Sequence, residues 1–114
     1  MTTMNDRENA FEAKFAHDEE FRFLVSARRD KLFAHWAAAT AGISGSAEDQ
    51  LVSDVLAIPN GPGHDAEMLR HIHGALAGRG AIVAESAAMT VLDRCAREAF
   101  AQLSAHPPEQ SDIV

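Results

Sequence analysis

The chain has 114 residues, of which 46% are hydrophobic, and it carries a formal net charge of −7; this length suits one domain with a single modest core. The negative charge argues against binding to nucleic acid or to an anionic membrane surface, because no basic face is large enough to neutralise several phosphates. The apolar stretches are much shorter than the roughly 20 residues that span a bilayer, and the acidic N-terminus lacks the apolar core of a signal peptide.

The first predicted element is a short amphipathic helix that carries Met4, Glu8, Phe11 and Phe15 on one face. Residues 6–20 hold six acidic and two basic side chains, which suit water better than a core. An isolated helix of this length is marginal in water, so we expect a mobile segment that becomes ordered on a partner. The alternative, that the two rings pack back on the rest of the chain, is equally consistent with the pattern.

A longer helix follows, and its apolar positions fall on one line from Phe21 through Trp36 to Ala39. Asp18 could cap a new helix, so the pattern allows either a hinge around residues 16–18 or one continuous helix. We assign Trp36 to the core of the bundle. Gly42 is predicted to end the helix.

The same helix carries the chain's only dense basic cluster, which consists of Arg28, Arg29 and Lys31 around Asp30. Acidic residues one turn earlier can pair with it. We therefore predict a solvated, self-neutralising face, with a patch for an acidic partner as the alternative.

Three shorter helices complete the prediction. The first begins with Ser46 as its N-cap, the second begins at Asp65 after a Pro/Gly-rich surface loop over residues 59–63, and the third runs from about residue 86 to about residue 104. The expected inward positions are Leu51, Val52, Val55 and Leu56, then Met68, Leu69, Ile72 and Leu76, then Ala88, Leu92, Cys95, Ala99 and Leu103, with Met89 and Phe100 beside the last stripe. Short connections between amphipathic helices predict an all-α fold, a small antiparallel four-helix bundle over residues 18–105 that carries a mobile segment over residues 1–17 and a flexible tail over residues 106–114.

Few side chains suggest a catalytic or metal-binding role. His71 and His73 point about 200 degrees apart on a helix, so with His64 they favour surface or structural roles over a metal site. Cys95, the only cysteine, has no partner for an internal disulfide, and its apolar helix face predicts a reduced core thiol in the cytoplasm. The sequence therefore predicts no catalytic residues, no metal site and no enzymatic activity.

Several motifs in the first third of the chain occur together in one known family, in the same order and spacing. They are Asp6-Arg7-Glu8, Ala10-Phe11-Glu12, Lys14-Phe15-Ala16-His17-Asp18, Ala27-Arg28-Arg29, Lys31-Leu32 and Trp36-Ala37-Ala38. Over about residues 5–38 the chain closely resembles the zeta subunit, the inhibitor of alphaproteobacterial F-type ATP synthases. After residue 38 the resemblance is much weaker.

The resemblance implies that the N-terminal segment turns helical and inserts at a catalytic interface of the ATPase head, between the alpha and beta subunits and against gamma. Insertion blocks ATP hydrolysis and leaves synthesis largely free. The expected partner-binding residues are Met4, Asp6, Arg7, Glu8, Phe11, Lys14, Phe15 and His17. The protein would then be cytoplasmic and peripheral to the inner membrane through the synthase.

A second hypothesis is a diverged regulatory bundle that binds a nucleotide or another small ligand without inhibiting the synthase. It is motivated by departures from the family pattern, among them Asp30 and the Pro/Gly-rich stretch over residues 59–63. No cofactor is expected; adenine nucleotide is the ligand that this second hypothesis would require.

Overall fold

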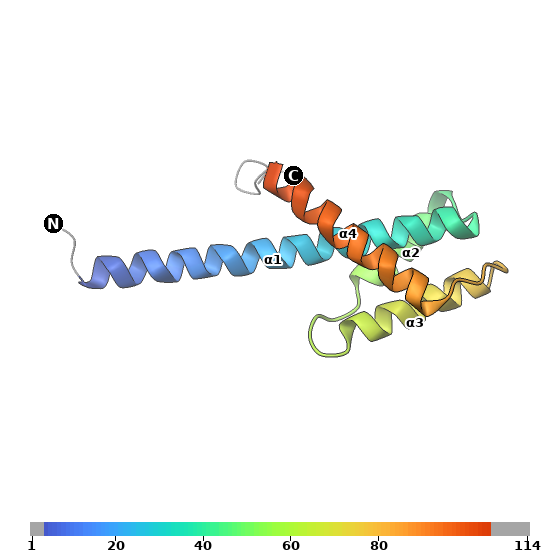
Figure 1. The fold of residues 1–114 in the computed structure, drawn as a ribbon, viewed down its shortest axis with the longest axis horizontal. Coiled ribbons are helices and arrows are strands. Elements are labelled where there is room, and N and C mark those ends of the chain that lie inside the picture. The colour runs from blue at the N-terminus through green and yellow to red at the C-terminus, as the bar shows by residue number, and fades with distance from the viewer. Residues whose placement is uncertain (1–3, 106–114) are drawn as a thin grey trace.

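The structure, a computed structural model, describes the backbone of residues 4–105 and the side chains of residues 17–105. In this part of the chain it consists of four α-helices without strands (Figure 1). They are α1 (Met4–Ala41), α2 (Gly45–Leu56), α3 (His64–Ala77) and α4 (Glu85–Ala105). The predicted all-α fold with four helices is confirmed, whereas the predicted tail at residues 106–114 lies outside the described residues.

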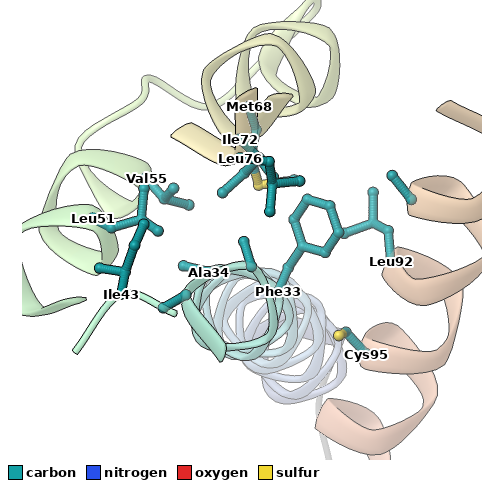
Figure 2. Packing of buried hydrophobic residues seen from close by; sticks show 13 residues of the cluster. Phe33, Ala34, Ile43, Leu51, Val55, Met68, Ile72, Leu76, Leu92 and Cys95 are labelled. Atoms are coloured by element: carbon teal, nitrogen blue, oxygen red, sulfur yellow. The ribbon is translucent and has the colours of Figure 1, made fainter. Parts of the chain in front are cut away.

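Helix α1 is the central element of the fold, and the other three helices pack around its C-terminal half (Figures 1 and 2). Phe33, Ala34, Ala37 and Ala38 of this half are fully buried. The three alanines let neighbouring helices approach closely, while the Phe33 ring reaches between α3 and α4 and stacks on Trp36 at 5.4 Å between ring centroids. Of the two alternatives for residues 16–18, the structure has the continuous helix.

The turn between α1 and α2 depends on two glycines. Gly42 (φ +72°) and Gly45 (φ +64°) adopt left-handed backbone conformations that other residues rarely take. The Ile43 amide donates to the Ala38 carbonyl at 2.8 Å and so closes the end of α1. Because Gly45 permits this tight entry, α2 begins directly after Ser44; the prediction of Ser46 as the N-cap is therefore wrong.

Most of the core positions predicted for the last three helices are confirmed. Leu51 and Val55 of α2, Met68, Ile72 and Leu76 of α3, and Ala88, Leu92, Cys95, Ala99 and Leu103 of α4 are all buried. Leu56 is 46% exposed and does not point inward as predicted, because it is the last residue of α2 and lies about 100 degrees around the helix from Val55. Val52 and Leu69 are half-buried at the edge of the core.

Cys95 lies in this core, as predicted, and burial raises the pKa of its thiol. Since the thiolate is the reactive form, we expect Cys95 in the folded chain to react with a disulfide reagent at least about tenfold more slowly than in the urea-unfolded chain. Absorbance of the released thiol at mildly alkaline pH measures both rates. Equal rates would show that the thiol is accessible.

Candidate partner-binding helix

The N-terminal half of α1 projects beyond the other three helices (Figure 1). With 38 residues, α1 is about 57 Å long, and it accounts for most of the 66 Å long axis of the molecule. Its other half is the centre of the core. One continuous helix therefore joins a projecting segment directly to the bundle.

The last turns of α4 provide the outermost support of α1 that the structure describes. Phe100 meets Phe21 edge to face, with 5.6 Å between ring centroids, and Arg28 donates a 2.7 Å hydrogen bond to the Gln102 side chain. No residue from 17 to 28 is buried, and Asp30 is the first residue of α1 that is buried in the described part. The fold thus stops covering α1 near Phe21.

The residues just before this support form a charged collar. His17, Asp18, Glu19 and Glu20 are all exposed. Glu19 pairs with Arg22 at 2.6 Å, but both side chains are more than half exposed, so water screens the attraction. Asp18, Glu19 and Glu20 of the collar therefore form an exposed acidic stretch between the bundle and the predicted inhibitory segment over residues 1–17.

The predicted partner-binding residues fall into two groups. The side chains of Met4, Asp6, Arg7, Glu8, Phe11, Lys14 and Phe15 lie outside the described residues, although their backbone forms the beginning of α1. His17 is described and exposed. Whether the two phenylalanine rings contact a partner or the bundle, whether the segment is mobile, and whether its boundary lies at residue 17 therefore stay predictions.

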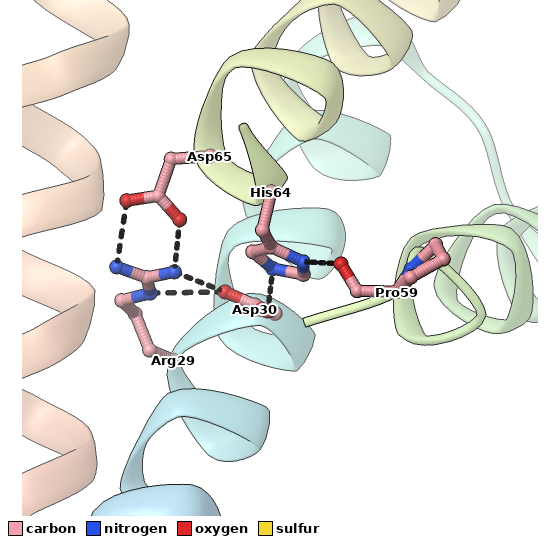
Figure 3. A network of polar contacts seen from close by, with 5 residues as sticks. All are labelled: Arg29, Asp30, Pro59, His64 and Asp65. Atoms are coloured by element: carbon pink, nitrogen blue, oxygen red, sulfur yellow. Dashed lines mark hydrogen bonds and ion pairs between the residues drawn. The ribbon is translucent and has the colours of Figure 1, made fainter. Parts of the chain in front are cut away.

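The basic cluster of α1 differs from its prediction. Arg28 and Lys31 are exposed, but the Arg29 side chain is only 18% exposed and binds Asp30 and Asp65 at 2.9 and 2.7 Å (Figure 3). Asp30 itself is buried beneath the start of α3. Part of the face that was predicted to be solvated thus makes polar contacts between α1 and α3, because α3 covers this side of α1.

The three histidines of α3 do not share a common site. His64 binds Asp30, whereas His71 lies 3.8 Å from Asp54 of α2 and His73 is exposed. Among residues 17–105 no group of three or more histidine, cysteine, aspartate or glutamate side chains is placed to hold a metal ion. The sequence pattern did not reveal the pairing of His64 with Asp30, because 34 positions separate the two residues.

A cavity of about 660 Å³ opens between α2 and α3. Its charged lining is mixed, with Arg70 and His71 beside Asp54 and Glu67. It is large enough for a small ligand, but nearby carboxylates oppose the binding of an anion. Nucleotide binding stays a prediction.

In the part of the chain that the structure describes, no helix is long and apolar enough to cross a membrane. A search of curated proteins and a search of solved structures each gave no significant match. The family model of the ATPase inhibitor subunit zeta matches residues 1–102, so the similarity continues through α2 and α3 and nearly to the end of α4, well beyond residue 38. The chain therefore belongs to the ATPase inhibitor subunit zeta family.

Proposed function

We propose that this chain inhibits ATP hydrolysis by an F-type ATP synthase, and that the N-terminal half of α1 inserts between the alpha and beta subunits of the catalytic head and against gamma. Family membership supports the inhibitor role and, with it, the role of a regulator rather than an enzyme. The observation that carries the insertion mechanism is the projection of α1 beyond every other helix (Figure 1).

A projecting helix suits insertion for a geometric reason. A single α-helix with side chains is about 10–12 Å across, so it can enter a gap between subunits from which a whole bundle is excluded. The support from α4 ends near Phe21, which leaves nearly five turns of α1 on its N-terminal side for contact with the head. The bundle then stays outside and limits how far the helix enters.

The proposed contacts combine apolar anchors with charged residues, as protein–protein interfaces commonly do. Phe11 and Phe15 supply the apolar anchors, and Asp6, Arg7, Glu8 and Lys14 supply charges that select and orient the partner. His17 lies at the end of this surface that is nearest the bundle. We propose that rotation in the hydrolytic direction is blocked while synthesis continues.

Inhibition of ATP hydrolysis by the purified head of the cognate synthase tests the proposal. We expect the full chain to inhibit and a chain lacking residues 1–17 to have no effect. Among residues 17–41 of α1 the buried side chains begin at Asp30, so the shortened chain should keep its bundle, and circular dichroism with thermal melting checks this. Equal inhibition by the two chains would contradict the insertion mechanism, and no inhibition by the full chain would contradict the inhibitor role.

The second hypothesis, a bundle that binds adenine nucleotide, has a separate test. Titration with ATP and Mg²⁺ should shift the backbone amide resonances of Arg70 and His71 if the cavity between α2 and α3 is the site. An unchanged spectrum at millimolar nucleotide would remove this hypothesis without affecting the first.

A further inference from the structure

A partly buried histidine–aspartate pair joins α3 to α1. His64, the first residue of α3, places Nε2 at 2.7 Å from Oδ2 of Asp30 (Figure 3). The two side chains are 10% and 5% exposed. Nδ1 of the same imidazole lies 3.0 Å from the Pro59 carbonyl oxygen in the loop between α2 and α3. One ring therefore connects α3, the loop and α1.

This geometry identifies the charge state of the ring. A carboxylate oxygen and a carbonyl oxygen are both acceptors, so each ring nitrogen must donate a proton to make its contact favourable. A neutral imidazole carries only one N–H, whereas the imidazolium carries two. The contacts of His64 with Asp30 and Pro59 are thus those of the cation.

The charged neighbours of His64 favour the cation as well. Arg29 binds Asp30 at 2.9 Å and Asp65 at 2.7 Å, so two cations balance two anions while His64 is protonated. Loss of that proton leaves one negative charge uncompensated, and the carboxylate that loses its partner is Asp30, whose side chain is only 5% exposed. On the side of α4, the Cys95 thiol is influenced by the charge of Arg29 together with those of Arg94 and Glu98 on its own helix.

The pKa of His64 follows from these opposing influences. Burial lowers it, but the hydrogen bonds to Asp30 and Pro59 and the charges of Asp30 and Asp65 outweigh burial, so the pKa lies above its ordinary value. The stabilisation is fully present below the unfolded-state pKa of about 6.5 and is lost as the pH rises through the higher pKa of the folded chain.

We propose that His64 is a pH-sensitive latch, which holds the loop over residues 59–63 and the first turn of α3 against α1 while protonated and releases them when deprotonated. Every residue of this loop is exposed, so the loop itself contributes little apolar burial to oppose opening. The release is local, because the core side chains of α3 begin one turn later at Met68.

Two NMR measurements on the full chain test the latch. Between about pH 6 and pH 9 the ring resonances should show His64 doubly protonated at the acidic end and titrating above the ordinary pKa of histidine. Over the same range, hydrogen exchange of the His64 and Glu67 amides, corrected for intrinsic base catalysis, should quicken relative to α4 amides. The change should be about tenfold for each unit by which the folded-state pKa exceeds the unfolded-state value.

Two variants and one control connect this change to the latch. In His64→Gln the pH-dependent part of the exchange should disappear, and in Asp30→Asn the His64 titration should move to lower pH. His73→Gln is the matched control and should behave like the unmodified chain. If Asp30→Asn fails to fold, as circular dichroism would show, the His64→Gln comparison still decides the outcome. A single ring proton on His64 at pH 6, or equal pH dependence of exchange in the unmodified chain and His64→Gln, would overturn the proposal.

Discussion

Replacing Phe11 and Phe15 together by alanine is expected to weaken inhibition of ATP hydrolysis at least about a hundredfold, close to the effect of removing residues 1–17. The physical reason is that two aromatic rings one helical turn apart are the largest apolar side chains of the projecting segment. Concentration–inhibition curves on the cognate head measure the loss. The melting temperature should stay within a degree or two, because the backbone of residues 11 and 15 lies in the part of α1 that projects beyond the other three helices (Figure 1).

Phe23→Ala is the matched control for this double substitution. Phe23 also lies on α1 and is 55% exposed, but it points about 80 to 120 degrees away from Phe11 and Phe15 and lies beyond the collar. It should leave inhibition nearly unchanged. A fall of several degrees in the melting temperature of the Phe11/Phe15 double variant would instead place those rings on the bundle.

Replacing Phe33 by alanine is expected to lower the free energy of unfolding by about 3–5 kcal/mol. Phe33 is fully buried at the centre of the fold, where it faces α3 and α4 (Figure 2). Its ring also stacks on Trp36. The substitution removes the ring and leaves a cavity that three helices must close together. Small domains have only about 5–15 kcal/mol of total stability, so this single change removes a large share of it.

Urea unfolding followed by Trp36 fluorescence and by circular dichroism measures this loss. Phe23→Ala serves again as the control, since truncation of a ring that is 55% exposed should cost less than about 1 kcal/mol. A loss below about 1 kcal/mol in Phe33→Ala would mean that the helices collapse into the vacated space and that the core is not built around this ring.

The sequence predicted the local features of this fold well, because they depend on periodicity. The buried stripe of α4, from Ala88 to Leu103, repeats at helical spacing and is found as predicted. The helix boundaries were less accurate, since the start of α2 depends on the left-handed conformation of Gly45 rather than on a capping side chain. Leu56 shows the same limit, because an apolar residue at the end of a helix can lie on either side of the stripe.

The polar contacts between α1 and α3 could not be predicted from periodicity. Asp30 stands among basic residues in the sequence, and that local pattern suits a solvated face. Its burial depends on His64 and Asp65 arriving from a different helix after a long loop. Periodicity contains no information on which polar residues of two helices meet. The partner-binding residues stay a prediction that rests on motif spacing, since the described side chains begin only at His17.

The continuity of α1 has a mechanical consequence. From Met4 to Asp30, the first buried residue of the helix in the described part, the rise is about 39 Å. A rotation of the bundle by about ten degrees about Asp30 would displace the tip by about 7 Å, more than one helical turn. Under the proposed mechanism, a torque acting on the inserted tip would be carried along the same helix to the buried residues Phe33 and Ala34, in the half of α1 that the other three helices contact.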